Sequence, residues 1–349
     1  MLKTPAYAVQ SAKSKFTPFT VERREPRAHD VLIDIAYCGI CHSDVHAARD
    51  EWGGSLFPMV PGHEIVGRVS RVGEAVAKWK VGDTVGVGCF VDSCRKCAAC
   101  LTGEEQFCEP GASFTYNGHE QDHKTPTFGG YSTRIVVDEN YVMRIPDGMD
   151  LQRTAPLLCA GITTYSPLKR YHVGPDSRVA VLGLGGLGHV GVRIAHALGA
   201  EVTVLSHSPK KKADALHLGA DEFVAIADPA ALRTHAKHFD FILDTVSAQH
   251  DYNAYLNLLR LGGAMVLVGL PEPAMLSAGP LIMGRRQLAG SLIGGIRETQ
   301  EMLDFCAAHK VFADVEPIEA QYLDQAYERM VKSDVRYRFV IDINSLKAT

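Results

Sequence analysis

The chain has 349 residues, of which 46% are hydrophobic and 22% charged, as is normal for a globular protein. This length exceeds what one hydrophobic core usually organises, so we expect two domains. The 36 basic and 40 acidic side chains give a net charge of −4, which argues against a nucleic-acid partner because no basic surplus neutralises a phosphate backbone. No run of about 18 apolar residues and no apolar leader is present, so we expect neither a membrane span nor a signal peptide.

The first part of the chain is expected to be rich in strands. Residues 31–88 contain short β-branched runs broken by glycine, such as VLIDIAY and VGDTVGVG, which predict a barrel-like β or α+β region. Residues 103–130 are polar and rich in Gly, Pro and His, so we expect a long loop there. Strands resume with YSTRIVV and YVMRIP.

From Ser177 the pattern changes, because apolar strands such as RVAVLG and EVTVLS alternate with helical segments such as GLGHVGVRIAHALG. Repeated βα units predict a parallel sheet with helices on both faces. A last helix, RETQEMLDFCAAHK, and a strand, RYRFVIDI, follow these units. We therefore expect a discontinuous first domain, 1–153 and 294–349, around a nucleotide-binding domain at 154–293.

The nine cysteines favour metal binding over disulfide bonds, since their number is odd and the chain is not a short secreted one. This use of cysteine suits a reducing compartment, and we expect a cytoplasmic protein. Four of them, Cys94, Cys97, Cys100 and Cys108, form C-x2-C-x2-C-x7-C, a spacing that lets four thiolates surround one tetrahedral ion. A closed shell of this kind predicts a structural zinc, and an iron–sulfur cluster is the alternative.

A second group of metal-ligating residue types is dispersed along the chain. The segment AYCGICHSDVHAARDEW holds Cys38 and Cys41 in a C-x-x-C spacing, which alone could be a redox dithiol, a zinc site or neither. His63 by itself is more often a hydrogen-bonded core histidine than a ligand, and Cys41 and Cys159 taken singly are more often packed thiols.

These motifs together resemble a known family. GHEIVGRVSRVGEAV (62–76), CGICHSD, the four-cysteine loop, PLLCAGITTYSPL and GLGGLGH stand in the order found in zinc-dependent medium-chain alcohol dehydrogenases. EIVGRV, GVGC and GGYS are typical of the cinnamyl alcohol dehydrogenase-like branch, which includes bacterial broad-range NADPH-dependent aldehyde reductases. The resemblance covers the whole chain and implies an α/β protein, with a GroES-like β-rich catalytic domain and a Rossmann domain built on a doubly wound parallel sheet.

The resemblance also implies residue roles at a catalytic zinc. Cys41, His63 and Cys159 match the zinc ligands, and two thiolates and one imidazole leave a fourth position open for water or substrate. Glu64 matches the carboxylate that can approach the metal. Asp44 matches the carboxylate that fixes the ring of a ligating histidine. Cys38 is then expected to be a packing residue, so that its C-x-x-C spacing with Cys41 has no redox meaning.

A glycine-rich turn predicts the cofactor site. VAVLGLGGLG places Gly183, Gly185 and Gly188 after a strand and at the start of a helix, the context in which G-x-G-x-x-G binds a dinucleotide pyrophosphate. An NAD site would carry an acid at the end of the second strand, but this chain has Ser206, His207, Ser208 and a lysine run there. Hydroxyls and ammonium groups suit a 2′-phosphate, and by resemblance Ser206, Ser208 and Lys211 contact it, so we expect NADP(H).

The resemblance extends the predicted cofactor site to further positions. These are His42, Thr163, Gly186, Leu187, His207, Thr245, Val246, Gly269, Leu270, Ser291, Ile293 and Arg338.

The expected reaction is reversible hydride transfer between NADP(H) and an aldehyde or primary alcohol. Ser43 and His46 match a proton relay from the site to solvent, although a cap serine and an exposed helix histidine are equally good readings. The predicted substrate pocket is apolar and suits an apolar or aromatic, cinnamaldehyde-like aldehyde; its residues are Trp52, Cys89, Phe90 and Ile293. We expect a homodimer, because GAMVLVGL and LAGSLIGGI resemble strands at the family's dimer edge.

Three alternatives remain open on these grounds. The first is an NAD-dependent zinc polyol or secondary alcohol dehydrogenase, which the serine–lysine cluster argues against. The second is a zinc-knuckle nucleic-acid-binding protein, which the net charge disfavours. The third is a catalytically inactive relative, which would be expected to lack a zinc ligand or a glycine of the turn.

Overall fold

The computed structural model describes residues 1–12, 14–271 and 273–346 and falls into two compact units. The first unit comprises Met1–Cys159, Gly294–Ala307 and the C-terminal segment from Ala313. The second comprises Ala160–Ile293 and Ala308–Phe312. In the described part of the chain, no helix combines the length and apolar character that crossing a membrane requires.

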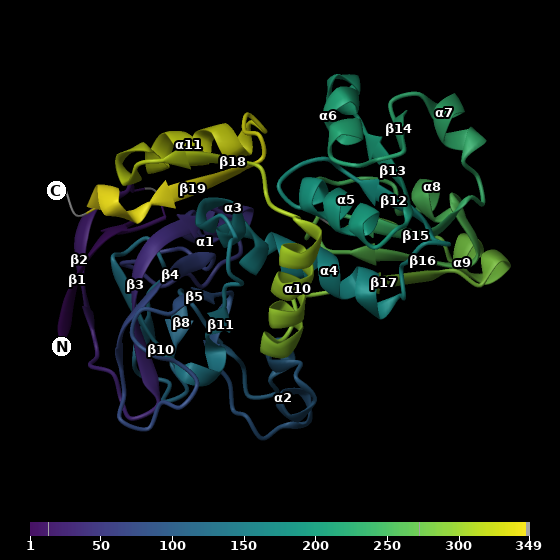
Figure 1. Ribbon diagram of the computed structural model, residues 1–349. Coiled ribbons are helices and arrows are strands. Elements are labelled where there is room, and N and C mark those ends of the chain that lie inside the picture. The colour runs from purple at the N-terminus through teal and green to yellow at the C-terminus, as the bar shows by residue number, and fades with distance from the viewer. Residues whose placement is uncertain (13, 272, 347–349) are drawn as a thin grey trace. The chain divides into compact units, whose positions relative to one another are not determined.

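The first unit is built on a seven-stranded sheet in the order β11–β5–β4–β3–β19–β18, with β10 paired to β3 (Figure 1). Its strands are β3 (Asp30–Gly39), β4 (Ile65–Val72), β5 (Thr84–Val87), β10 (Arg134–Asp138), β11 (Met143–Arg144), β18 (Val315–Ile318) and β19 (Arg338–Asp342). β3 is the central strand, and its ten residues are mostly buried because β4, β10 and β19 all pair with it. β1 (Leu2–Ala8) and β2 (Thr17–Arg23) form a separate antiparallel pair.

Short elements connect these strands. The helices are α1 (His42–Ala48), α2 (Ala98–Thr102), α3 (Leu151–Thr154), α10 (Ile296–His309) and α11 (Leu323–Val331), and the short strands are β6 (Phe90–Asp92), β7 (Ser113–Phe114), β8 (Gly118–His119) and β9 (Pro126–Thr127). The segment 103–130, expected to be a loop, therefore carries three two-residue strands. α11 has no counterpart among the predicted elements, although its buried residues Leu323, Ala326, Tyr327 and Met330 follow a helical period.

The second unit is a six-stranded parallel sheet in the order β14–β13–β12–β15–β16–β17. Its strands are β12 (Arg178–Leu182), β13 (Glu201–Ser206), β14 (Glu222–Ala225), β15 (Phe239–Asp244), β16 (Leu259–Leu267) and β17 (Gln287–Gly290). Its helices are α4 (Ala160–Arg170), α5 (Gly188–Ala197), α6 (Lys212–His217), α7 (Pro229–Thr234), α8 (Tyr252–Leu256) and α9 (Ala278–Gly284). The alternating β and α segments predicted from Ser177 onward are confirmed. The strand order reverses beside β12, and such a switch point creates the crevice in which doubly wound sheets bind nucleotides.

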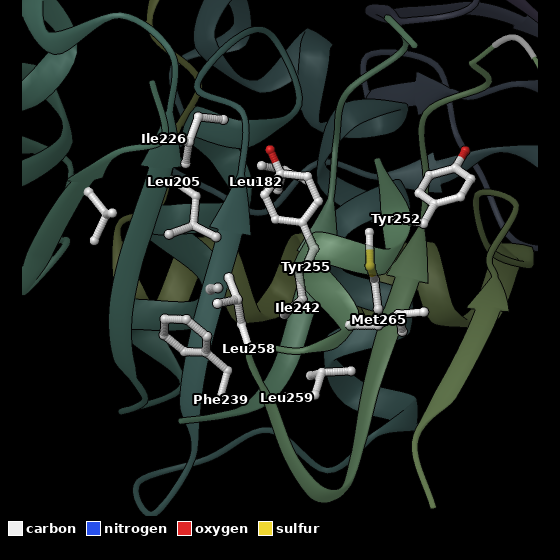
Figure 2. Packing of buried hydrophobic residues seen from close by; sticks show 13 residues of the cluster. Leu182, Leu205, Ile226, Phe239, Ile242, Tyr252, Tyr255, Leu258, Leu259 and Met265 are labelled. Atoms are coloured by element: carbon white, nitrogen blue, oxygen red, sulfur yellow. The ribbon is translucent and has the colours of Figure 1, made fainter. Parts of the chain in front are cut away.

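The core of the second unit lies on both faces of this sheet. Figure 2 shows one face, where Leu182, Leu205, Ile242 and Met265 from four neighbouring strands pack with Tyr255 of α8. Because side chains alternate along a strand, the neighbours of these residues point to the other face, which α4 and α5 cover. The close fit of Gly191 in α5 against Leu243 of β15 marks that second layer.

Candidate active site and metal centres

The first metal-ligating group forms where β3 ends and α1 begins. Cys41 is the N-cap of α1, and Asp44 is the third residue of that helix. The Asp44 carboxylate turns back and accepts the backbone N–H of Cys41 at 2.8 Å. This is the geometry of a capping box, so the local sequence that starts the helix also fixes the backbone of Cys41.

Four side chains from distant parts of the first unit meet beside Cys41. They are Cys41, His63, Glu64 and Cys159, and one ligand atom from each lies within 4.8 Å of all the others. The Sγ atoms of Cys41 and Cys159 are 3.9 Å apart. Two thiolates on one tetrahedral zinc, with Zn–S bonds of about 2.3 Å, lie about 3.8 Å apart, so this donor set fits a zinc ion.

Asp44 is hydrogen-bonded to two members of this group, Cys41 and His63. It is completely buried, and its Oδ1 accepts from His63 Nδ1 at 3.1 Å and from the backbone N–H of Gly62 at 3.2 Å. Its Oδ2 accepts from Cys41 N–H and from the Tyr131 hydroxyl, the latter at 3.3 Å. With Nδ1 donating to Asp44, His63 presents Nε2 as the free ligand atom.

Glu64, the fourth member of the group, is held by Arg338 of β19. The Arg338 guanidinium donates to Glu64 Oε1, and both side chains are buried. Glu64 Oε2 has no hydrogen-bond partner among the described residues, so it is an orphaned acceptor that a cation could use. A Cβ at Gly39 would collide with this oxygen, which explains the glycine in CGICHSD.

The electrostatics of this group follow from burial and close contact. The hydrogen bond with Cys159 lowers the pKa of the Cys41 thiol well below its ordinary value, and His63 acts in the same direction. The same bond raises the pKa of Cys159. Burial lowers the pKa of His63, but the Asp44 carboxylate outweighs it and the net shift is strongly upward. Burial raises the pKa of Glu64 to about 7, against the opposing charge of Arg338.

The four-cysteine group forms a second compact set of thiols. Single ligand atoms from Cys94, Cys97, Cys100 and Cys108 all lie within 4.8 Å of one another. The Sγ atoms of Cys94 and Cys100 are 3.9 Å apart, again the spacing of thiolates on a tetrahedral ion. The backbone N–H of Cys97 donates to Cys94 Sγ, and that of Cys94 donates to Cys108 Sγ, both at 3.3 Å. Such N–H groups favour the thiolate form that binds metal.

The loop that carries these cysteines is anchored on both sides. Ser93 Oγ lies 3.1 Å from Cys100 Sγ and 2.6 Å from the Tyr141 hydroxyl, and the Arg95 guanidinium covers the Tyr141 ring. Arg297 of α10 donates to the carbonyl of Thr102. Cys38 belongs to neither metal group; it is buried, with Sγ packed against Gly62 and Gly130.

The glycine-rich turn follows β12 in the second unit. Gly183 has φ +91°, a conformation that favours glycine, and a Cβ at Gly188 would collide with the Gly183 carbonyl. Open space surrounds the Cβ position of Gly185, so the backbone there can be approached closely. This cradle at the start of α5 suits a pyrophosphate.

The end of β13 lies beside this turn. Ser206 Oγ accepts weakly from the backbone N–H of Ser208, at 3.4 Å, and Lys211 Nζ donates to the Leu184 carbonyl of the turn at 2.7 Å. Glu201 stands at the start of β13 and is exposed there, away from the carboxyl end of the strand. Hydroxyls and an ammonium group thus occupy the place of the acid in an NAD site.

The other predicted cofactor residues fall into two groups. Thr245, Val246 and Gly269 follow β15 and β16 and pack around the turn: Thr245 Oγ1 donates to the Leu182 carbonyl at 2.8 Å, and a Cβ at Gly269 would lie 2.5 Å from the Val246 carbonyl. Thr163, Gly186, Leu187, His207, Leu270, Ser291 and Ile293 also belong to the second unit, whereas His42 and Arg338 belong to the first.

The predicted relay and pocket residues of the first unit lie as follows. Ser43 is half-buried on α1, and His46 Nδ1 lies 2.5 Å from Glu51 Oε2 while its ring stacks on Trp52, whose side chain is 55% exposed. Cys89 is partly buried next to the carbonyl of Leu158. Phe90 is buried, with its ring edge-on to Tyr141.

Comparison with known protein families agrees with this geometry. Residues 27–147 match the alcohol dehydrogenase GroES-like domain, and residues 186–308 match the zinc-binding dehydrogenase family. The "Probable formaldehyde dehydrogenase AdhA" of Bacillus subtilis is 58% identical over 99% of both chains, and the NADP-dependent alcohol dehydrogenase C of Mycobacterium bovis is 56% identical over 99% of this chain and 100% of its own. The chain belongs to the zinc-dependent medium-chain alcohol dehydrogenases.

Solved structures place it within this family. The cinnamyl alcohol dehydrogenase SbCAD4 of Sorghum bicolor is 45% identical, with a TM-score of 0.96 over 98% of both chains. The cinnamyl alcohol dehydrogenase of Helicobacter pylori, solved in complex with NADP(H), is 44% identical, with a TM-score of 0.92 over 98% of this chain and 99% of its own. The predicted resemblance to the cinnamyl alcohol dehydrogenase-like branch is confirmed.

Several residues that shape the site were not singled out in the sequence. Tyr131 donates to Asp44. The sequence predicts Arg338 only as a cofactor contact and does not indicate its pairing with Glu64. Gly39 makes room for Glu64. A glycine between a strand and a metal-ligand motif is a usable signal. Tyr131 lies in the GGYS segment, but nothing in that segment predicts that its hydroxyl bonds to Asp44.

Proposed function

We propose that this family member is a zinc-dependent, NADPH-using aldehyde reductase that interconverts aldehydes and primary alcohols. The observation that carries the proposal is the group of two thiols and one imidazole at Cys41, Cys159 and His63, ordered by the buried carboxylate of Asp44. Three such ligands with an open fourth position are typical of catalytic zinc sites. The relatives named for NADP-dependent alcohol dehydrogenation and for cinnamyl alcohol dehydrogenation support the same reaction.

We assign the catalytic zinc to Cys41, His63 and Cys159, and a structural zinc to the four-cysteine group. When bound at the first site, zinc supplies a Lewis acid for the carbonyl oxygen of the substrate. Asp44 keeps Nε2 of His63 directed at the ion, and Arg338 holds Glu64 beside it. Four thiolates at the second site leave no open position, so its role is to stabilise the loop.

For the cofactor we assign the turn Gly183–Gly188 to the pyrophosphate and Ser206, Ser208 and Lys211 to the 2′-phosphate. The missing acid at the end of β13 and the position of the Lys211 ammonium beside the turn support NADPH over NADH. We assign cofactor binding to the second compact unit and catalysis to the first. The first segment of the catalytic unit ends at Cys159, so the second unit begins at Ala160, six residues after the expected start of the cofactor domain at 154.

Ser43 and His46 are our proposed relay for the proton that completes aldehyde reduction. Both lie on α1, one and four residues beyond the helix start, and His46 is partly exposed with Glu51 next to its Nδ1. An imidazole that is close to Cys41 in sequence and partly exposed to solvent can pass a proton between the site and water.

For the substrate we favour an apolar or aromatic aldehyde over a polyol. Trp52, Cys89, Phe90 and Ile293 are the proposed pocket residues, and none of them offers the several hydrogen-bond partners that a polyol would need. The name of the Bacillus subtilis relative makes formaldehyde the obvious competitor.

We further propose a homodimer that forms along β17 and resides in the cytoplasm. β17 is an edge strand of the second unit's sheet, and large apolar side chains in the segment between β16 and β17 are exposed, including Leu270 at 71%, Met275 at 91%, Ile282 at 76% and Met283 at 86%. An unpaired edge beside an apolar surface favours pairing with another chain. Nine free thiols suit a reducing compartment.

The experiment that tests the proposal is a steady-state panel of formaldehyde, aliphatic aldehydes, cinnamaldehyde and a polyol, each with NADPH and with NADH. We expect the highest kcat/KM with an apolar aldehyde and NADPH, and about two zinc ions per chain by metal analysis. C41A should lose the catalytic zinc and the activity, while C38A, three residues away, should keep both. Turnover only of a polyol with NAD, or full activity in C41A, would overturn the proposal.

A further inference from the structure

His250 occupies an unusual position just after β15. Its side chain is only 7% exposed, its Nε2 lies 2.7 Å from Asp244 Oδ2, and its Nδ1 lies 2.8 Å from the carbonyl oxygen of Ala248. Tyr252 and Tyr255 of α8 place their rings edge-on to the imidazole, at 4.9 and 5.7 Å between centroids.

Both contacts require the imidazole to donate. A backbone carbonyl has no proton to give, and an ionised carboxylate has none either. A neutral imidazole has one N–H, so it could satisfy only one of the two partners. The geometry therefore selects the doubly protonated, cationic ring. The pKa of His250 agrees in direction: burial lowers it, but the bonds to Asp244 and to the Ala248 carbonyl outweigh burial and raise it.

Asp244 connects this cation to the glycine-rich turn. Its Oδ1 accepts the backbone N–H of Val246 at 3.0 Å, and its own backbone carbonyl accepts Val268 N–H at 2.9 Å. The Cβ positions of Gly183 and Gly188 lie 2.9 and 3.2 Å from Thr245 Oγ1. The loop that follows β15 thus packs against the glycine-rich turn. His250, at the end of this loop, bonds back to its first residue, Asp244, and to the carbonyl of Ala248.

We propose that His250, as an imidazolium, is a positioning residue that keeps the loop 244–250 in the shape the cofactor requires. Its partners among the described residues are Asp244, the Ala248 carbonyl, Tyr252 and Tyr255, none of them an assigned zinc ligand, and it acts through Asp244 on the neighbouring Thr245 and Val246. The inference goes beyond the proposed reaction, since it assigns a role to a residue that no part of that reaction uses. It rests on the proposed cofactor site.

The charge of this ring makes cofactor binding depend on pH. The ionisable groups that face it among the described residues are Asp244, Asp251 at the start of α8, Tyr252 and Tyr255. Burial raises the pKa of Tyr255 to about 12 and shifts that of Tyr252 in the same direction, so both phenols stay neutral near pH 7. Because the pKa of His250 is raised in the folded protein, the imidazolium makes both hydrogen bonds below about pH 6.5. It loses one of them as the pH rises through this raised pKa.

The chain offers a matched control in His235. Its Nδ1 lies 3.0 Å from the Ala231 carbonyl and its Nε2 lies 3.0 Å from Glu222 Oε2, the same pattern of acceptors. Glu222 is the first residue of β14, so this pair lies at the amino end of the parallel sheet, opposite the cofactor edge. H235Q therefore removes a histidine with the same kinds of acceptor, at a more exposed carboxylate, without touching the loop 244–250.

The test measures the NADPH Kd by cofactor fluorescence, without substrate, for the zinc-loaded wild type, H250Q and H235Q between about pH 6.5 and 9. We expect H250Q to raise Kd about tenfold near pH 6.5, the effect of losing a charged hydrogen bond, with the ratio to wild type falling toward one at high pH. At saturating NADPH, kcat should change less than KM. H235Q should follow the wild type.

A Kd for H250Q within twofold of wild type at every pH, or an equal rise in H235Q, would overturn the inference. Histidine-selective NMR of the wild type provides a check that needs no variant: both ring nitrogens of His250 should carry protons at pH 7, and a neutral ring would also overturn it. If the wild type bound no NADPH, the proposed function itself would fail, which separates the two results.

Discussion

The carboxylate of Asp44 joins the two halves of the proposed catalytic zinc site: Oδ1 lies 3.1 Å from His63 Nδ1, and Oδ2 lies 2.8 Å from the backbone nitrogen of Cys41. One buried carboxylate therefore orients an imidazole ligand and also fixes the helix start that presents a thiolate ligand. Neither contact involves the metal, yet both act on its ligands.

D44N should weaken zinc binding at this site. The amide keeps the volume but cannot accept hydrogen bonds from all four donors, so we expect an affinity loss of about 10- to 100-fold and a similar loss of activity. Chelator competition followed by metal analysis measures this directly. D34N on β3, at an exposed ion pair with Arg134, is the control and should retain zinc. Unchanged zinc retention in D44N would contradict the positioning role.

Loss of one thiolate from the four-cysteine loop should affect stability more than chemistry. We expect C97S to contain about one zinc per chain and to lower Tm by more than about 10 °C, because a structural zinc contributes its binding energy to folding. C306S, a change at a buried cysteine outside both groups, is the control for loss of an ordinary thiol. Two zinc ions in purified C97S would refute the assignment.

Cofactor preference should respond to the end of β13. A carboxylate at position 206 would face the 2′-phosphate, and repulsion of like charges should lower kcat/KM for NADPH at least tenfold relative to NADH, an effect of about 1.4 kcal/mol or more. The measurement is the ratio of kcat/KM for the two cofactors in S206D and in wild type. E201Q, at the exposed start of the same strand, should leave the ratio unchanged.

His46 should matter for turnover if it carries the proton. In H46A we expect kcat for aldehyde reduction near neutral pH to fall by at least about tenfold, with zinc content unchanged, because general acid catalysis contributes factors of this size or larger. W52A removes the stacking partner of His46 and separates ring placement from proton transfer. A loss of less than a few-fold in H46A would remove this histidine from the mechanism.

The proposed dimer depends on exposed apolar side chains in the segment between β16 and β17. Charged side chains at Ile282 and Met283, which are 76% and 86% exposed, should block association by leaving buried charges unpaired, so I282D/M283D should be monomeric in light scattering where the wild type is dimeric. L101D, at an exposed leucine of the first unit, is the matched control and should remain dimeric. A monomeric wild type would end the proposal.

The four-cysteine site and the cofactor turn could be predicted from the sequence because the motifs that mark them are local. The four cysteines lie within one short loop, and the glycine-rich turn stands between a strand and a helix that hydrophobic patterning marks on its own. Each of these motifs can be recognised without knowledge of the tertiary fold, since a short stretch of backbone determines which of its atoms meet. The family motifs then connected them to zinc and a dinucleotide.

The family motifs grouped Cys41, His63 and Cys159 at one metal, but only the tertiary structure shows which of their atoms meet and which other side chains join them. Cys41 and Cys159 are 118 residues apart, and Glu64 and Arg338 are 274 apart, so no spacing rule joins them before β3, β4 and β19 form one sheet. The fourfold bonding of Asp44 and the doubly donating His250 are likewise properties of a packed interior. A side chain acquires such partners only when burial removes water and the surrounding elements supply the missing donors and acceptors.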